Sequence, residues 1–279
     1  IKEFYQQYSQ GNVDFDKVHV LHAWGTLSEP GLYSNVAQKI GADIYTYKQA
    51  VSSFGNQKAF GGICNEILKR LEMNEIENLP MYDYVLIDEA QDFPPSFFQL
   101  AYKLFKTPEK RIVYAYDELQ TLNKSSMPSL EEMFGVDENN KPLVDIGNSD
   151  DLSKPRTDII LPICYRNSKW ALTIAHALGF GVYRDEPQPL VQFFKDLDVW
   201  KEIGYEKIDG DLKFNHFVKL RRRTDSTPAY FDRLLSPQDA VFVPSAFNNK
   251  DEEYMWVAQQ IKKNITEDEL DPDDILVIF

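Results

Sequence analysis

The stretch YDYVLIDEAQDFPP at residues 82–95 decides the fold. Its apolar run VLI, at residues 85–87, predicts a short strand that is buried on both faces, as strands inside a parallel sheet are. Asp88 and Glu89 follow this run directly. The stretch ends in two prolines, which are placed where a helix can begin. We therefore expect a strand, an acidic turn and a helix in succession.

A second strand is predicted after this helix. Apolar residues repeat at helical spacing behind the prolines, and RIVYAYDELQ at residues 111–120 then has strand character and contains Asp117. Strand, helix and strand make one βαβ unit, and the segment from Asp88 to Asp117 has the roughly 30 residues that such a unit needs. Both carboxylates would lie at the carboxyl ends of neighbouring parallel strands, where open α/β sheets bind ligands. The predicted fold class is therefore α/β with a parallel sheet.

Carboxylates in this position suggest a site for a divalent cation. Mg²⁺ in phosphate-transferring sites is held by one or two carboxylates together with phosphate oxygens, and a neighbouring carboxylate can orient or deprotonate an attacking water. On the residues alone, Asp88, Glu89 and Asp117 are the candidate functional residues. Two other interpretations stay open: a plain acidic turn in an acidic chain, and a metal-dependent nuclease that uses Asp88, Glu89 and Asp92 as ligands.

Three strings in this region resemble motifs of superfamily 1 helicases of the UvrD/Rep type, and they come in the family's order. DEAQD at residues 88–92 resembles the Walker B motif, or motif II. AYDELQ at residues 115–120 resembles motif III, and LPICYRNS at residues 161–168 resembles motif IV. Upstream, VHVLHAWG at residues 18–25 predicts a strand that runs into a loop and resembles motif Ib.

The chain departs from the family pattern at several positions. Tyr116 stands where motif III prefers Gly, Cys164 stands at the Asn position of motif IV, and His22 stands where Thr is usual in motif Ib. Many relatives carry DNA-stacking aromatic residues just after motif III, where this chain has Asn123 and Ser125. These departures bear on how the chain would contact DNA.

The resemblance implies two RecA-like motor domains, neither of them complete. Residues 1–150 would form part of the first, with a helical insertion around residues 31–79, and residues 151–279 would begin the second. The sequence contains no Gly-Lys pair, so it has no GxxxxGK[ST] phosphate loop. It starts with Ile1, and its last residues, ILVIF, have the character of a core strand. We therefore expect a piece of a longer protein, from motif Ib to just past motif IV, with the phosphate loop upstream.

The resemblance also implies roles for the residues that follow the two strands. Asp88 would bind the Mg²⁺ of ATP, usually through water, and Glu89 would be the general base for the attacking water. Gln91 and Gln120 would sense the γ-phosphate and couple it to DNA. Asp117 would belong to the same nucleotide-coupled network.

The remaining implied roles belong to motifs IV and Ib. Arg166 would contact the γ-phosphate as an arginine finger, and Tyr165 would stack on the adenine ring. The loop with His22 and Trp24 would lie along single-stranded DNA. Trp24 has two open interpretations: stacking on a base, a contact worth roughly 1–3 kcal/mol, or packing against a neighbouring helix.

Composition limits the other possibilities. The net charge of −14 over 279 residues argues against a globally basic nucleic-acid binder. The densest basic patch is the run of three arginines at residues 221–223, which is either a phosphate contact or a solvated edge. The two cysteines, Cys64 and Cys164, form no disulfide framework or zinc pattern, which indicates a reducing, cytoplasmic setting. No apolar stretch approaches the length of a membrane span.

Local patterns predict further elements. Residues 31–79 are mostly helical in pattern, including YKQAVSSF and AFGGICNEILKRLEM. Ser129 would cap a short helix through Phe134, with Glu132 at the capping-box position. Strands are predicted in DIILPICYR, VFVPSAF and ILVIF, and helices in WALTIAHALGFG and at residues 251–265.

These patterns together predict the central part of an ATP-dependent superfamily 1 DNA helicase or translocase. ATP and Mg²⁺ would be its cofactors, and single-stranded DNA its partner, with RNA not excluded. The alternative of a different class is a non-catalytic interaction module derived from a helicase. A GKT or GKS string after an upstream strand would separate the two.

Overall fold

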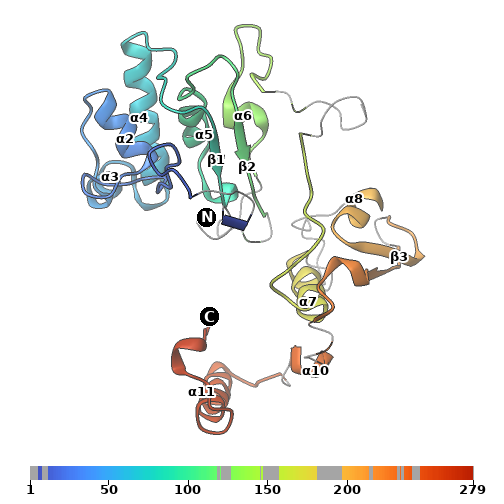
Figure 1. Ribbon diagram of the computed structural model, residues 1–279. Coiled ribbons are helices and arrows are strands. Elements are labelled where there is room, and N and C mark those ends of the chain that lie inside the picture. The colour runs from blue at the N-terminus through green and yellow to red at the C-terminus, as the bar shows by residue number, and fades with distance from the viewer. Residues whose placement is uncertain are drawn as a thin grey trace. The chain divides into compact units, whose positions relative to one another are not determined.

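The computed structural model describes residues 6–7, 12–117, 120, 127–144, 146, 157–180, 197–213, 216–230, 233, 236–240 and 246–278. The chain divides into two compact units (Figure 1). Unit 1 comprises Ile1–Ile160 and His176–Phe194, and unit 2 comprises Leu161–Ala175 and Lys195–Phe279. In the part of the chain that the structure describes, no helix has both the length and the apolar composition needed to cross a membrane.

Unit 1 begins with a group of helices, which confirms the helical pattern of residues 31–79. They are α2 (Leu32–Lys39), α3 (Tyr47–Phe54), the 3₁₀ turn η1 (Asn56–Lys58) and α4 (Ala59–Met73). The N-terminus of α3 has a capping box in which the Thr46 side chain accepts a hydrogen bond from the Gln49 backbone N–H. The apolar side of α4, which includes Ile63, Ile67 and Leu71, is buried in the core.

The predicted βαβ unit is present and forms the other half of unit 1. β1 (Val85–Ile87) is followed by the 3₁₀ turn η2 (Ala90–Asp92), α5 (Pro95–Tyr102) and β2 (Ile112–Tyr114). The two strands pair in parallel, with Val85 beside Ile112 and Ile87 beside Tyr114. A mixed α/β fold with a small parallel sheet is therefore confirmed.

Aromatic side chains join α5 to the sheet and to the next helix. Phe98 of α5 is fully buried, and its ring lies 6.1 Å from the Tyr114 ring and 5.9 Å from the Phe134 ring, measured between centroids. Burial raises the pKa of the Tyr114 phenol, and the Asp158 carboxylate adds to the shift. Phe134 ends α6 (Leu130–Phe134), which lies beside β2 in Figure 1.

The cap of α6 follows its sequence pattern in detail. The Ser129 side chain accepts a hydrogen bond from the Glu132 N–H, and the Glu132 carboxylate accepts one from the Ser129 N–H at 2.8 Å. These two bonds satisfy backbone donors that the start of a helix leaves unpaired. The predicted capped helix from Ser129 to Phe134 is confirmed.

The prediction that β1 is buried on both faces is wrong. Val85 and Ile87 are buried, but Leu86 is 76% exposed, and Val113, its neighbour in register on β2, is 61% exposed. The two strands are the whole of this sheet in the described residues. Burial alternates along both strands, so one side of the sheet faces the core and the other is exposed. An apolar run cannot reveal how many elements cover a sheet, because that depends on distant parts of a chain.

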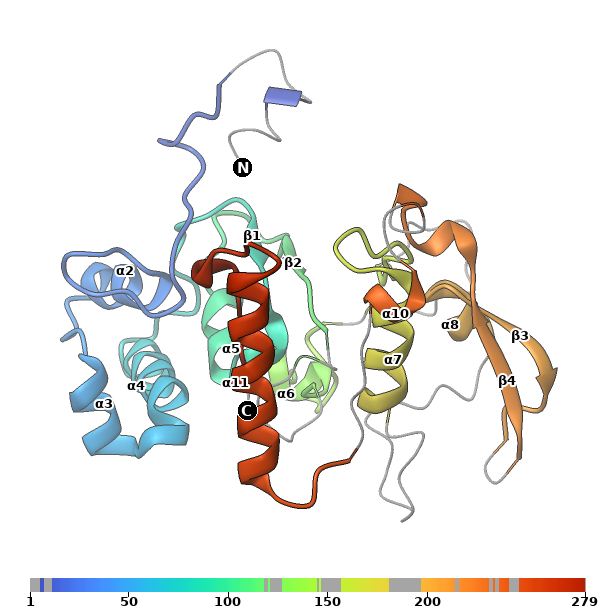
Figure 2. The same cartoon turned by 90° about the horizontal axis from the view of Figure 1, so that it is seen from below.

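Unit 2 is built around an antiparallel hairpin (Figure 2). Its strands are β3 (Tyr205–Gly210) and β4 (Val218–Arg222), with Tyr205 opposite Arg222. α8 (Leu197–Glu202) precedes the hairpin, and the 3₁₀ turn η4 (Thr224–Ser226) follows it.

Two helices confirm predictions from the sequence. α7 (Lys169–Gly179) is the helix predicted in WALTIAHALGFG, and the division between the units crosses it at Ala175. The remaining helical elements are α10 (Pro237–Ala240), α11 (Lys250–Thr266) and η5 (Pro272–Asp274), and α11 confirms the helix predicted at residues 251–265.

Three predicted strands do not form. Residues 158–166 and 275–278 are extended or irregular without strand pairing, and in residues 18–25 only His22 makes an isolated bridge, to Gly31. A strand needs a neighbour for its backbone N–H and C=O groups, and apolar composition does not supply one. The VFVPSAF strand falls mostly on residues outside the described part of the chain, as do Asn123 and Ser125.

Candidate functional site

The two parallel strands bring their carboxyl ends to one edge of the sheet. Beyond the strands, the Ala115 N–H donates to the Ile87 carbonyl at 2.9 Å, and the Ala90 N–H donates to the Ala115 carbonyl at 2.9 Å. Backbone pairing thus continues past both strands as far as the turns that carry Asp88, Glu89 and Asp117. The side chains expected to gather at this edge do gather there.

Gln91 joins the two turns. Its side chain is only 8% exposed. Its Nε2 donates to Glu89 Oε2 at 2.7 Å, and its Oε1 accepts from the Asp117 N–H at 3.1 Å. Gln120 Nε2 in turn donates to Asp117 Oδ2 at 2.7 Å. One hydrogen-bonded path therefore runs from Glu89 through Gln91 and Asp117 to Gln120, and it links DEAQD to AYDELQ.

Glu89 sits in an unusual backbone conformation at the start of this path. Its φ of 51° and ψ of 45° lie in the left-handed region, which costs a non-glycine residue roughly 1–2 kcal/mol. The Asp88 Oδ1 accepts the Glu89 N–H at 3.1 Å, and both side chains are exposed. Residues held in such conformations cluster at functional sites. The backbone of Glu89 is therefore consistent with a functional role for its side chain.

The donor set at this edge fits a Mg²⁺ ion that is shared with phosphate oxygens. Asp88 presents an exposed carboxylate with one oxygen that has no hydrogen bond in the described residues, and Asp92 is exposed nearby. Among the residues that the structure describes, no three His, Cys, Asp or Glu side chains are grouped so that they could hold a metal ion by themselves. A nucleotide-bound Mg²⁺ needs only one or two carboxylates from the protein.

Tyr165 and Arg166 lie in unit 2, on the segment of residues 161–168. Tyr165 is 70% exposed. Arg166 is also exposed, and it makes no ion pair or hydrogen bond with any described residue. The expectation that a strand precedes Arg166 is wrong, because the segment is held by side-chain and isolated backbone contacts instead. One of these joins the Cys164 N–H to the Ser226 carbonyl at 3.1 Å.

Trp24 packs against a neighbouring helix, which is one of the two interpretations that the sequence allowed. Its ring is stacked on Phe60 of α4 at 5.5 Å between centroids, and its indole Nε1 donates to the Tyr45 carbonyl at 3.0 Å. His22 is exposed next to it, and its carbonyl accepts the Leu32 N–H at 2.8 Å. Contact of either residue with nucleic acid stays a prediction.

The three consecutive arginines do not form one basic surface. Arg221 Nε donates to Glu206 at 2.8 Å, and Arg223 Nε donates to Asp225 at 2.9 Å. Arg222 between them is 7% exposed. Sequence reasoning missed this residue, although residues 218, 220 and 222 alternate along a strand and so share its inner face.

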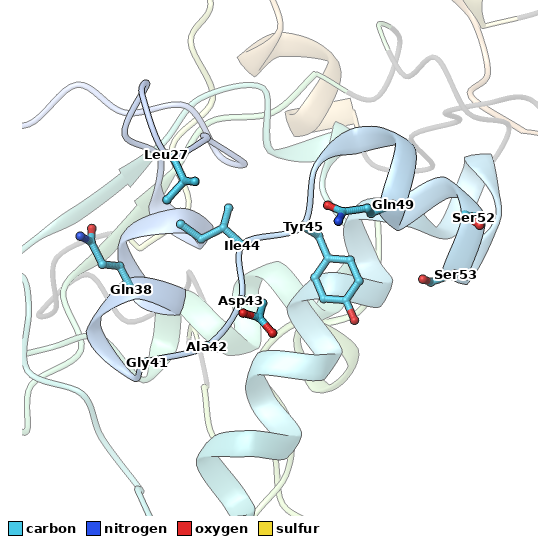
Figure 3. Close-up of a pocket in the computed structure, with 10 residues that line it drawn as sticks. All are labelled: Leu27, Gln38, Gly41, Ala42, Asp43, Ile44, Tyr45, Gln49, Ser52 and Ser53. Atoms are coloured by element: carbon cyan, nitrogen blue, oxygen red, sulfur yellow. The ribbon is translucent and has the colours of Figure 1, made fainter.

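Unit 1 also has an open pocket of about 760 Å³ away from the sheet edge (Figure 3). It is formed by the end of α2, the connection that contains Asp43 and Tyr45, and α3, from which Gln49 and Ser52 contribute. None of the residues singled out in the sequence lines it. The pocket therefore adds nothing to the arrangement around Gln91.

The role of Gln91 as a bridge can be tested through stability. In Gln91→Met, a side chain of similar length makes neither hydrogen bond and leaves the Asp117 N–H without its partner. We expect the free energy of unfolding to fall by about 1–3 kcal/mol, measured by urea denaturation. Gln57→Met is the control, because Gln57 is exposed and its side chain makes no hydrogen bond with described residues. An equal loss in the two variants would contradict the bridging role.

The sheet edge thus offers exposed carboxylates on a turn that a buried glutamine ties to the next strand. Such a set can bind a hydrated cation and hold a water for deprotonation. The exposed guanidinium of Arg166 can neutralise phosphate charge. No protein-family profile, no curated protein and no solved structure matches this chain, so its geometry and its motifs carry the functional interpretation.

Proposed function

We propose that this chain is the central part of an ATP-dependent superfamily 1 DNA helicase or translocase. The observation that carries the proposal is the hydrogen-bonded path from Glu89 through Gln91 and Asp117 to Gln120. A path of this kind can couple the state of a nucleotide to a second strand of the sheet. The order of the three motif-like strings supports the same proposal.

The residues at the sheet edge would share the work of ATP hydrolysis. Bound Mg²⁺ would neutralise phosphate charge, and Asp88 would hold it, usually through water. Glu89 would accept the proton of the attacking water, while Gln91 keeps its carboxylate in place. Gln120 and Asp117 would transmit the change at the γ-phosphate.

The other proposed parts concern the second motor domain and DNA. Both halves of the chain would belong to RecA-like domains. Arg166 would contact the γ-phosphate, and Tyr165 would stack on adenine; both are exposed in unit 2. Single-stranded DNA would pass along the segment with His22 and Trp24. The two free cysteines fit a reducing, cytoplasmic setting.

Phosphate release provides the test. The sequence has no phosphate loop, so this chain alone, with saturating single-stranded DNA, should release phosphate from ATP only at the background rate. A longer protein that joins it to an upstream GKT or GKS loop should hydrolyse ATP, and single-stranded DNA should accelerate the reaction. Hydrolysis by the chain alone that is lost in Glu89→Gln would overturn its assignment as a part of the motor. A longer protein without DNA-stimulated hydrolysis would favour the non-catalytic interaction module.

A further inference from the structure

Arg222 is a charged residue inside unit 2. It ends β4 and is 7% exposed, while its two neighbours in sequence are more exposed and form ion pairs. Burial of an arginine is costly unless its donors are hydrogen-bonded. Its contacts therefore indicate what it holds together.

The Arg222 guanidinium donates to four neutral acceptors. Nη1 donates to the Ile203 carbonyl at 3.0 Å, and Nη2 donates to the carbonyls of Ser226 at 2.9 Å and Pro162 at 3.4 Å. Nε donates to Thr227 Oγ1 at 3.3 Å. Within the described ranges, no carboxylate lies at ion-pair distance from it. The Tyr205 ring lies 5.4 Å from the guanidinium carbon and adds a cation–π contact.

These acceptors come from three separate places in the chain. Ile203 precedes β3, and Ser226 and Thr227 follow β4, so Arg222 closes the base of the hairpin. Pro162 belongs to the segment that also carries Tyr165 and Arg166. The Ser226 carbonyl, which Arg222 holds, accepts the Cys164 N–H of the same segment at 3.1 Å.

The backbone next to Arg222 allows Gly204 and Ser226 to approach each other closely. Gly204 has a φ of 92°, and a Cβ there would lie 2.6 Å from Ser226 Cβ, so only glycine fits. Ser226 is 1% exposed, and its hydroxyl donates to the Arg223 carbonyl at 2.7 Å. Two ties, at Pro162 and Cys164, therefore anchor the segment immediately before the exposed Tyr165 and Arg166.

We propose that Arg222 is a positioning residue that fixes the segment of residues 161–168 on the hairpin and so presents Tyr165 and Arg166 to a nucleotide polyphosphate. The anchoring follows from the contacts of Arg222, and the identity of the ligand rests on the proposed function. Loss of the guanidinium fork frees the segment without removing either exposed side chain. A lysine keeps the charge but cannot reach acceptors on several sides at once.

The two cysteines give a direct readout on the chain as it stands. Cys164 lies in the anchored segment, half-buried, with its Sγ 3.8 Å from Asn167 Nδ2. Cys64 is fully buried in unit 1, and burial raises the pKa of its thiol, which keeps it unreactive. The rate at which a thiol reagent modifies Cys164 therefore reports release of the segment, and modification of a second thiol reports unfolding of unit 1.

The experiment compares Arg222→Lys and Arg222→Met with Arg221→Met, which removes the exposed neighbour on the same strand. Thiol modification is combined with hydrogen exchange of peptides from residues 161–168 and from the hairpin. A hydrogen bond from a charged group changes an equilibrium by about tenfold or more. We expect both Arg222 variants to raise Cys164 modification and exchange of the Cys164 N–H by about tenfold, while the hairpin stays protected and Arg221→Met matches the unmodified chain.

Several results would overturn the anchoring. One is an unchanged rate in Arg222→Lys and Arg222→Met. Another is an equally faster modification of Cys164 in Arg221→Met, which would show that the loss of a positive charge, and not of the Arg222 contacts, releases the segment. A third is a rise in hairpin exchange by the same factor as in the segment, which would make Arg222 a core residue of the hairpin alone. If the segment is released as expected but Arg166→Ala leaves ATP hydrolysis by the longer protein unchanged, the nucleotide assignment fails and the anchoring stands.

Discussion

Arg166→Ala should lower the rate of ATP hydrolysis by roughly 10³-fold or more in a protein that joins this chain to a phosphate loop. Arginine fingers raise the hydrolysis rate of GTPases by roughly 10³–10⁵-fold. The guanidinium would neutralise charge that develops on the γ-phosphate in the transition state. The side chain is available for this role, because it is exposed and makes no ion pair with described residues. Steady-state phosphate release, with and without single-stranded DNA, measures the effect.

A matched control separates this role from a general loss of charge. Arg221 is also an exposed arginine of unit 2, but it is already paired with Glu206, and exposed pairs contribute only about 0.2–1 kcal/mol to stability. Arg221→Ala should therefore leave hydrolysis near the unmodified rate, and circular dichroism should show both variants folded. If Arg166→Ala hydrolyses ATP as fast as Arg221→Ala, the motif IV assignment fails, and the helicase proposal rests on the strings at residues 88–92 and 115–120.

Glu89→Gln should have the second-largest effect, a loss of roughly 10²–10⁴-fold in kcat in the same longer protein, which is the usual contribution of a general base. The amide cannot accept the proton of the attacking water. Its oxygen can still accept the hydrogen bond that Gln91 Nε2 gives to Glu89, so the path to Asp117 stays intact. ATP should still bind, and equilibrium binding of a fluorescent ATP analogue, measured beside turnover, distinguishes lost chemistry from lost affinity.

Asp83→Asn is the control for this variant. Asp83 lies just before the other end of β1, where its carboxylate pairs with Lys106 at 2.9 Å. Removing this exposed ion pair should change stability by less than about 1 kcal/mol and leave kcat as it was. A similar kcat for Glu89→Gln and Asp83→Asn would show that Glu89 is not the base.

Local sequence signals determined the helices of this protein. Thr46 and Ser129 each precede a helix with Gln or Glu at the third helical position, and both capping boxes form. The prolines at residues 94–95 start α5, and apolar spacing alone predicted α4 and α11. These features depend on residues within one or two helical turns of each other, so the local sequence is enough to predict them.

The βαβ unit was also predictable from the sequence. A short apolar run, a helix of suitable length and a second run allow few arrangements, and parallel pairing of β1 with β2 is the one observed. Parallel pairing then puts Asp88 and Asp117 at one edge. Order and spacing therefore predicted the shared position of these two carboxylates, whereas Gln91 and Gln120 were singled out only by the resemblance to helicase motifs.

Only the tertiary structure decided which side chains face inward and which segments find a partner. The exposure of Leu86, the unpaired residues 158–166 and the hairpin of β3 with β4 could not be derived from local pattern. The same holds for Gln91, which bridges two turns, and for Arg222, which is buried although Arg221 beside it is exposed. Burial and strand pairing are contacts between residues distant in sequence, and their free energy depends on what the rest of the fold places beside them.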